Sequence, residues 1–197
     1  MKTFAAALAF VAVAQAKCQT DTQLIEQGEG LRKCEYVDTT GNRTVCYGFN
    51  LETSSARKNV EAVGGNFDDV YNGGCLSQSQ CEKLLDQQVD VARQGEKRIY
   101  GNSITCQCAT YVLVDMTYNL GEGGLSSFND FNHLMETGQW DAAADDLSGT
   151  LWCSQVGSRC TRDQNQIRSC DSKALPDWSP VIDLFSDLIT DVSLAKN

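Results

Sequence analysis

The sequence predicts a mainly helical α+β fold in two lobes, with a small N-terminal β-hairpin sheet and one long helix between the lobes. Two runs rich in β-branched and aromatic residues, 34–37 and 43–47, flank a turn sequence at 40–42, which is typical of a hairpin. A Ser/Gln capping box opens the amphipathic run 77–98, which predicts the long helix. A helix of this length often connects two lobes.

Shorter helices are expected on both sides of these elements. The first covers 20–29, where Thr20 or Thr22 caps its start and two glycines weaken its end. Three more are predicted at 109–120, 128–136 and 140–147. The segment 66–74, in contrast, is predicted from its composition to be a loop.

The two ends of the chain are expected to lie outside the main domain. Residues 1–16 combine a charged start, an apolar run and an Ala-Gln-Ala cleavage sequence, which predicts a secretory signal peptide. The segment 179–197 predicts an amphipathic helix that packs on the preceding lobe or, as the alternative, binds a partner. The domain at 17–178 is expected to consist of a first lobe (about 17–76), the long helix (about 77–98) and a second lobe (about 99–178).

Cysteine content and charge narrow the class of protein. Ten cysteines predict five disulfides, although their spacing leaves the pairing open. A zinc site is not expected, because the chain has 1 histidine and Cys106 and Cys108 are too close together for a ligand pair. The net charge of −10 argues against nucleic acid as a partner. We therefore expect a secreted monomer with no cofactor, no metal and no membrane span.

Three residues around the hairpin carry groups suited to acid–base chemistry. Glu29 ends the first predicted helix, where the negative end of the helix dipole favours a protonated carboxyl group. Asp38 ends a strand beside a polar turn, where solvent and amides favour the ionised form. Thr44 lies on the returning strand, close to Asp38 across the hairpin. A carboxylate and a hydroxyl together can orient one water molecule.

Glycoside hydrolysis with inversion uses such a set of groups. One acid protonates the glycosidic oxygen and a second carboxylate activates water on the opposite face, with the carboxyl groups about 6.5–9.5 Å apart. Sequence spacing does not fix this distance. Acidic residues beside a turn are also commonly solvated surface, so the residues alone leave both interpretations open.

A wider series of motifs accompanies these residues. The hairpin carries Glu29-Gly30-Leu31-Arg32, Tyr36-Val37-Asp38, Gly41 and Thr44-Val45-Cys46-Tyr47-Gly48-Phe49. Weaker matches follow in order as SQSQCEKLLDQQVDVA, MTYNLGEGGLSSF, GQWDAAADDL and LWCSQVGSRCTRD. Over about 20–170 this series resembles the phage-type lysozymes, glycoside hydrolase family 24. The resemblance implies a two-lobed, lysozyme-like fold with a cleft between the lobes, and its last motif corresponds to a tryptophan followed by a basic loop.

The resemblance also implies roles for individual residues. Glu29 matches the general acid, Asp38 and Thr44 match the residues that position the attacking water, and Arg159 matches a basic residue that packs against the acid. The implied substrate contacts are Asn50, Tyr118, Asn119, Phe128, Phe131 and Arg159. For Tyr118 and Phe131 a role in the core is the alternative, and Trp152 is expected to be structural.

Two departures from the family pattern fall in the hairpin. Cys46 replaces a glycine, and Phe49 stands where a histidine is common. Since Cys34 and Cys46 flank the turn almost symmetrically, we hypothesise a disulfide between them that braces the hairpin. The acidic balance is a further departure, which suggests a digestive or acid-adapted enzyme, because bacterial cell walls are themselves anionic.

The function predicted from these observations is that of a secreted muramidase acting on bacterial peptidoglycan. It would hydrolyse the β-1,4 bond between N-acetylmuramic acid and N-acetylglucosamine. The alternatives are a chitin hydrolase, a transglycosylase that excludes water, and a non-catalytic glycan-binding module. The presence of both Asp38 and Thr44 argues against the transglycosylase.

Overall fold

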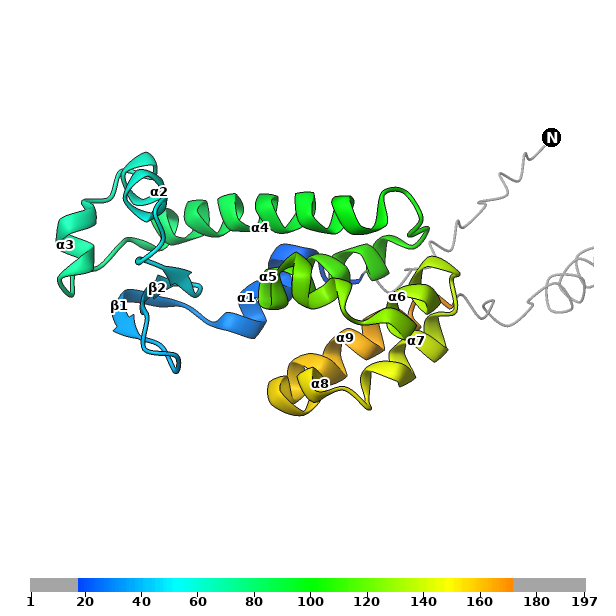
Figure 1. Ribbon diagram of the computed structural model, residues 1–197. Helices are drawn as coiled ribbons and strands as arrows, with labels where there is room; N and C mark the ends of the chain where they lie inside the picture. Colours follow the sequence, from blue (N-terminus) through cyan, green and yellow to red (C-terminus); the bar gives the residue numbers. More distant parts are fainter. Residues whose placement is uncertain (1–17, 172–197) are drawn as a thin grey trace, which may run out of the picture.

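The computed structural model describes residues 18–171, which form a mainly helical fold with one small antiparallel sheet (Figure 1). In chain order its elements are α1 (Asp21–Glu29), β1 (Arg32–Val37), β2 (Arg43–Cys46), β3 (Phe49–Asn50), α2 (Ala56–Ala62), α3 (Phe67–Tyr71), α4 (Gln78–Tyr100), α5 (Gln107–Ser126), α6 (Asn129–Glu136), α7 (Trp140–Leu147), α8 (Leu151–Val156) and α9 (Ser158–Arg168). The predicted fold class is confirmed. The predicted signal peptide at 1–16 and the predicted helix at 179–197 lie outside the described residues.

The predicted hairpin is present, and a short third strand extends it. β1 pairs with β2 and β2 pairs with β3, both antiparallel, and Tyr36 lies opposite Thr44. The turn closes where the amide of Asp38 donates a hydrogen bond of 2.9 Å to the carbonyl of Asn42. Because paired residues of a sheet point to the same face, this register places Tyr36 and Thr44 on one side of the hairpin.

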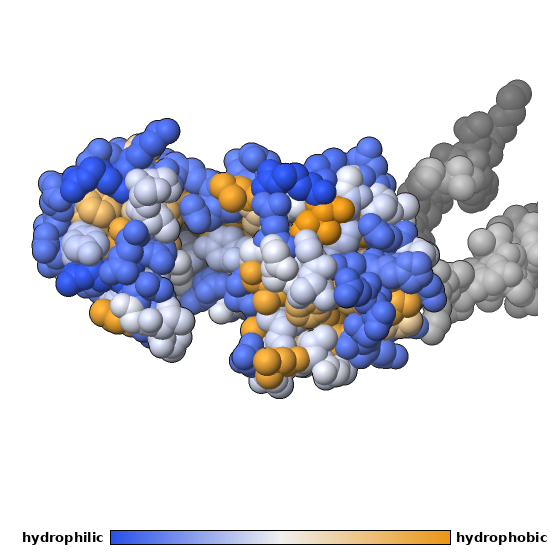
Figure 2. All heavy atoms as spheres, viewed as in Figure 1, coloured by the Kyte–Doolittle hydropathy of each residue, from blue (hydrophilic) through white to orange (hydrophobic). Residues whose placement is uncertain are grey.

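Two hydrophobic cores lie at opposite ends of the molecule. One is built by the sheet, α2, α3 and the first part of α4, with Val45 and Leu84 fully buried in it. The other is built mainly by α5 to α9 and contains Leu113. Neighbouring residues of α1 serve both cores, since Ile25 is buried in the first and Leu24 in the second. Figure 2 shows a hollow between the two halves of the molecule.

The long helix α4 connects these two cores. The predicted capping box is confirmed, with the Ser77 hydroxyl and the Gln80 side chain each bonded to the other's backbone amide. The helix has 23 residues and ends two residues later than predicted, before Gly101. At a rise of about 1.5 Å per residue it is about 35 Å long, enough to run along both halves as Figure 1 shows.

All ten cysteines are paired, as expected from their number. The bridges are Cys18–Cys108, Cys34–Cys75, Cys46–Cys81, Cys106–Cys170 and Cys153–Cys160. The hypothesised Cys34–Cys46 bridge is therefore wrong. A shift of register in β1 places Arg32, not Cys34, opposite Cys46. Cys46 is buried against α4, whereas Cys34 is exposed and pairs with Cys75 at the outer edge of the sheet.

Two local predictions also need correction, and one helix was missed. The predicted loop at 66–74 contains α3, whose start is capped by the Asn66 side chain. The predicted basic loop after Trp152 is helical, because α8 and α9 follow each other with only Gly157 between them. The helix α2 was not predicted. All three errors concern short helices of 5 to 11 residues, for which periodicity is a weak signal.

Candidate active site

Glu29 lies at the point where the hairpin, α1 and α9 meet. It is the last residue of α1, and its side chain is 23% exposed. Oε1 accepts a hydrogen bond of 2.8 Å from Nη1 of Arg159 on α9. Oε2 lies against Gly48 of the hairpin, where an added Cβ atom would stand 3.3 Å away. The carboxyl group is thus bonded on one side to the guanidinium of Arg159. On the other side it lies against Gly48, which has no side chain to displace it.

Arg159 is itself fixed by a second carboxylate. Its guanidinium donates from Nε to Oδ2 of Asp115 (2.9 Å) and from Nη2 to Oδ1 of Asp115 (2.8 Å), which is the bidentate geometry typical of Arg–Asp pairs. Arg159 is 7% exposed and Asp115 is fully buried. The sequence resemblance placed Arg159 beside Glu29, and the structure confirms this contact. Asp115 was not predicted.

A glycine makes room for this guanidinium. Gly28 precedes Glu29 in α1, and a Cβ atom at this position would lie 3.0 Å from Cζ and Nη1 of Arg159. Glycine within a helix costs about 0.5–1 kcal/mol relative to alanine. Its presence here is explained by the close approach of Arg159, in addition to its position near the end of the helix.

Asp38 lies in the turn of the hairpin, in a different environment. Its Oδ1 atom accepts hydrogen bonds from the amide of Thr40 (2.8 Å), the hydroxyl of Thr40 (2.8 Å) and the amide of Asn42 (2.9 Å). These bonds lower the pKa of Asp38, with the Asn42 amide as the largest cause. The carboxylate is thus kept ionised, as the sequence predicted.

Thr44 lies on the returning strand opposite Tyr36, which precedes Asp38 by two residues. The side chains of Asp38 and Thr44 both bond to the backbone of Asn42, the first to its amide and the second to its carbonyl. The Thr44 hydroxyl is deeply placed, since the residue is 2% exposed and Oγ1 donates to the carbonyl of Asn42 at 3.2 Å. A hydroxyl also has lone pairs that can accept a bond from water.

Tyr36 connects the environments of the two carboxyl groups, although no role was predicted for it. Burial is the main cause that raises the pKa of Tyr36, the Arg32 guanidinium lowers it, and the charges of Glu29 and Asp38 both raise it. The phenol therefore lies within the field of both carboxylates. The Arg32 guanidinium stacks 4.5 Å above the ring. The only signal in the sequence was its place in the Tyr36-Val37-Asp38 motif.

Four of the six predicted substrate contacts line two cavities that adjoin Glu29, whereas Phe128 and Phe131 line neither of them. Asn119 and Arg159 line one of about 390 Å³ together with Glu29. Asn50 and Tyr118 line a second of about 460 Å³ together with Gly48, the residue against which Glu29 lies. Both cavities therefore open next to the same carboxyl group.

Two of the predicted contacts make structural bonds. Tyr118 donates from its hydroxyl to the carbonyl of Tyr47 (2.8 Å), which links α5 to the hairpin. Burial and, second, the charge of Glu29 raise the pKa of Tyr118. Asn119 is exposed, and its Oδ1 atom accepts a bond of 2.8 Å from Nε1 of Trp152, which is itself buried as expected for a structural residue.

Phe131 belongs to the hydrophobic core, the alternative that the sequence left open. It is fully buried and meets Phe128 edge-on, with 6.4 Å between the ring centres. Phe128 is half-buried against the same core. We therefore do not retain Phe131 as a sugar contact.

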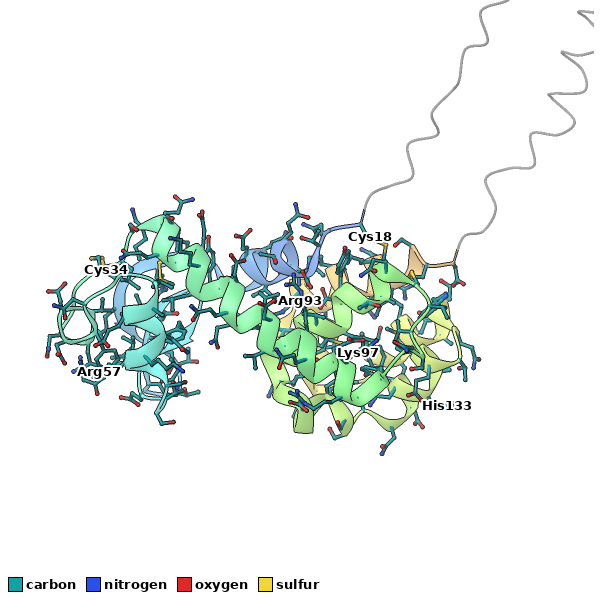
Figure 3. The ribbon with its side chains drawn as sticks, turned by 90° about the horizontal axis from the view of Figure 1, so that it is seen from above. Cys18, Cys34, Arg57, Arg93, Lys97 and His133 are labelled. Atoms are coloured by element: carbon teal, nitrogen blue, oxygen red, sulfur yellow. A yellow bond between two sulfur atoms is a disulfide. The ribbon has the colours of Figure 1, made fainter. Side chains whose placement is uncertain are left out.

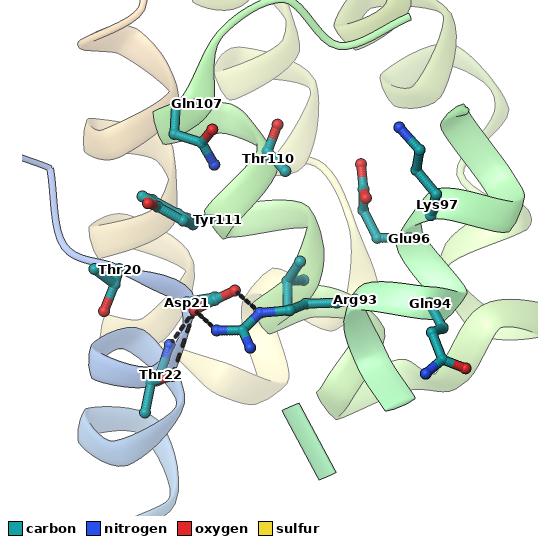
Figure 4. Close-up of a pocket in the computed structure, with 11 residues that line it drawn as sticks. Thr20, Asp21, Thr22, Arg93, Gln94, Glu96, Lys97, Gln107, Thr110 and Tyr111 are labelled. Atoms are coloured by element: carbon teal, nitrogen blue, oxygen red, sulfur yellow. Dashed lines mark hydrogen bonds and ion pairs between the residues drawn. The ribbon is translucent and has the colours of Figure 1, made fainter. Parts of the chain in front are cut away.

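A cavity larger than these two lies elsewhere, between α1, α4 and α5 (Figure 4). It has a volume of about 760 Å³ and contains none of the predicted site residues. At its edge Arg93 forms an ion pair with Asp21, with Nε–Oδ2 and Nη2–Oδ1 distances of 2.7 and 2.8 Å. Figure 3 shows Arg93 and Lys97 on α4, seen from above.

Neither a metal centre nor a membrane span is found in the part of the chain that the structure describes. Within residues 18–171, no three or more His, Cys, Asp or Glu side chains are grouped so that they could hold a metal ion. None of the described helices combines the length and the apolar composition needed to cross a bilayer.

The two-lobed fold and the arginine-bound glutamate agree with a lysozyme-type glycosidase. The family model described as phage lysozyme matches residues 26–165, more than two thirds of the 197-residue chain. The chain therefore belongs to the phage lysozyme family, and its general activity is hydrolysis of peptidoglycan.

Proposed function

We propose that this protein is a secreted muramidase that cleaves the β-1,4 bond between N-acetylmuramic acid and N-acetylglucosamine, with inversion at the anomeric carbon. The placement of Glu29 carries the proposal: Arg159 holds its carboxyl group at 2.8 Å, and Gly48 leaves its other oxygen accessible to the hairpin side. The glycan lies across the two adjoining cavities. Its proposed contacts are Asn50, Tyr118, Asn119 and Phe128.

Glu29 acts as the general acid. Its proton passes to the glycosidic oxygen as the bond from that oxygen to the anomeric carbon breaks. Glu29 then carries a negative charge, which the guanidinium of Arg159 stabilises at 2.8 Å. Because Asp115 fixes both nitrogens at the far side of that guanidinium, the interaction needs no reorganisation during the reaction.

Asp38 and Thr44 act on the attacking water. The ionised Asp38 carboxylate accepts a proton from water while the water oxygen bonds to the anomeric carbon on the face opposite the leaving group. The Thr44 hydroxyl orients that water. Support comes from the lowered pKa of Asp38, which keeps a base available, and from the bonds of both side chains to the backbone of Asn42.

Secretion is supported by the cysteines. All ten are paired in five disulfides, which form and persist in oxidising compartments. This agrees with the signal peptide that the sequence predicts at 1–16.

One experiment separates this function from its alternatives. The purified protein is incubated with soluble peptidoglycan fragments, and the first products are followed by proton NMR and mass spectrometry. We expect a reducing N-acetylmuramic acid end that appears first as the α-anomer. A β-anomer that appears first would mean retention, and a 1,6-anhydro product would mean a transglycosylase. Binding without cleavage would mean a glycan-binding module, and cleavage of chitin oligomers alone would mean a chitin hydrolase.

A further inference from the structure

Behind Glu29 lies a cluster of charged side chains that extends well beyond the contact with Arg159. It joins α1, α5 and α9 and consists of Glu29, Asp115, Asp163, Arg159 and Arg162. Asp115 and Asp163 are fully buried, and the two arginine side chains are only 7% and 13% exposed.

Arg162 joins the three helices. It donates from Nη1 to the carbonyl of Leu24 in α1 (2.9 Å) and from Nη2 to Oδ2 of Asp115 in α5 (2.9 Å). It also contacts Oδ1 of Asp163, from Nε at 3.0 Å and from Nη2 at 2.9 Å. Since Leu24 and Glu29 belong to the same helix, Arg162 anchors the helix that carries the acid, while Arg159 holds the acid itself.

The charges of this cluster do not balance if every carboxyl group is ionised. Once Glu29 has given its proton to the substrate in the proposed reaction, two guanidinium groups face three carboxylates, which would leave one uncompensated negative charge among buried side chains. Such a charge is strongly unfavourable, and a protein usually avoids it by binding a proton. One proton makes the cluster neutral.

The contacts indicate which carboxyl group holds that proton. Both oxygens of Asp115 accept bonds from guanidinium groups, and Glu29 is partly exposed to solvent. Asp163 has an oxygen, Oδ2, that finds no hydrogen-bond partner among residues 18–171. Burial, and next the charge of Asp115, raise the pKa of Asp163 to about 8.

Other charged groups near Asp163 do not change this balance. Its own helix presents Arg159 and Arg162 toward the cluster, and Arg168 at the far end pairs with Asp145 of α7 at 2.5 Å. The carboxylates of α7 are exposed or half-exposed, and α8 has no charged residue. The remaining facing groups are Asp115 on α5 and Glu29 on α1.

We propose that Asp163 is a positioning residue that works as a neutral carboxylic acid, whose bound proton lets Asp115 and the two arginines hold Glu29 in place. Loss of that proton adds a negative charge beside Asp115, which competes for the guanidinium of Arg162 and loosens the hold of Arg162 on α1. The site is thereby built for acidic and neutral conditions and weakens in alkaline ones. Its relevance to catalysis rests on the proposed role of Glu29.

The sign of the effect on stability follows from proton binding. Asp163 has a pKa of about 8 in the folded protein, whereas an unperturbed aspartate titrates near 3.9. Between these values the folded state binds one more proton than the unfolded state, so a rise in pH destabilises the fold. The contribution of Asp163 is complete below about pH 4 and is lost progressively up to about pH 8.

Carboxyl ¹³C NMR of the intact protein tests the proposal. The Asp163 signal is assigned by its loss in Asp163→Asn, and we expect its titration midpoint near pH 8. In Asp115→Asn two carboxylates face two arginines, so the midpoint of Asp163 should fall by more than one pH unit. A midpoint below 5 in the wild type, or one that Asp115→Asn leaves unchanged, would overturn the proposal.

Thermal unfolding from pH 4 to pH 9 gives a second readout. Asp163→Asn keeps a neutral side chain of equal size, so the melting temperature of this variant should fall less with pH than that of the wild type or of the control Asp86→Asn. Parallel pH dependence in all three proteins would contradict the proposal. Neither readout needs lytic activity, so both remain decisive even if Glu29→Gln shows that the proposed function is wrong.

Discussion

The two carboxyl groups of the site are supported in opposite ways. Glu29 is held by Arg159, a residue 130 positions away in the sequence, within a buried cluster that joins three helices. Asp38 is held by the amides and hydroxyl of residues two to four positions away, in an exposed turn. The proposed acid thus depends on tertiary packing, whereas the proposed base depends on local turn geometry.

This difference determines how sensitive the orientation of each carboxyl group is to changes elsewhere in the protein. A side chain fixed by a buried ion pair keeps its orientation only while the packing around it is intact. A turn that closes on its own aspartate is largely independent of distant residues. We therefore expect that mutations far from the site affect Glu29 more than Asp38.

The largest effect is expected from Glu29→Gln. The amide cannot donate the required proton, so the rate of wall lysis should fall by at least about 10²–10⁴-fold. Glu26→Gln, three residues earlier on α1, is the matched control and should retain activity. Turbidity of purified walls measures the rate, and far-UV circular dichroism confirms the fold. A folded Glu29→Gln protein with near-wild-type lysis would remove Glu29 from the mechanism.

The second largest loss of lytic activity is expected from a substitution beside Asp38. Thr44→Val keeps the shape of the side chain but removes the hydroxyl, so we expect a loss of about 10–100-fold in lysis, within the range of a misplaced reacting group. Asn42→Gln removes the same Asn-Arg-Thr glycosylation sequence but keeps the backbone amide that bonds Asp38, and activity should change little.

Expression in bacteria, which removes any glycan, makes this pair of variants comparable. Equal large losses would show that Asn42 itself is required. Equal small losses would show that Thr44 does not position the water.

The sequence predicted the parts of the site that depend on neighbouring residues. It missed most of the parts that depend on residues far apart in the chain. The hairpin, its turn and the ionised state of Asp38 were all predictable, because they depend on residues close together in the chain. The Glu29–Arg159 contact was expected only through the family resemblance. Asp115, Arg162 and Asp163 were not found at all, and the one signal was a charged residue, Asp115, inside the apolar run 111–117.

The errors have the same origin. The bulge in β1 changes which residue faces Cys46, and a two-residue change of register cannot be read from turn composition. The short helices α2, α3, α8 and α9 are stabilised by packing, capping and, for α8 and α9, by the Cys153–Cys160 bridge. The long helix α4 was predicted well, because a capping box and a hydrophobic period mark it. The bounds predicted for α7 were also correct, although this helix has only 8 residues.

A smaller loss of activity is expected from Gly28→Ala. Alanine normally stabilises a helix by about 1 kcal/mol relative to glycine. Here the new methyl group would lie 3.0 Å from the guanidinium of Arg159, which Asp115 prevents from moving freely. We expect about a 10-fold decrease in lysis from the displaced Arg159–Glu29 pair, since an error of about 1 Å in position can cost more than that.

Gly123→Ala is the matched control. Gly123 lies in α5, and an added methyl group there would have no neighbouring residue within 4 Å. Its activity should stay unchanged. Equal activity of the two variants would show that the orientation of Arg159 is not limiting.

The smallest loss of lytic activity is expected at Tyr118, which links the helical half of the site to the hairpin. Tyr118 on α5 donates a 2.8 Å hydrogen bond to the carbonyl of Tyr47 at the end of the hairpin, and so connects the helical half to the turn half of the site. Tyr118→Phe removes that bond and leaves the ring in place. The free energy of unfolding should fall by about 1 kcal/mol, the usual net value of one such bond. If the hairpin is locally supported, lysis should fall by less than about 5-fold, because Asp38 keeps its turn and Glu29 keeps Arg159. Denaturant unfolding and the wall-lysis rate measure the two quantities. A loss of activity as large as that of Thr44→Val would show that the hairpin depends on α5 for its position, and that the base is held by tertiary packing as much as the acid is.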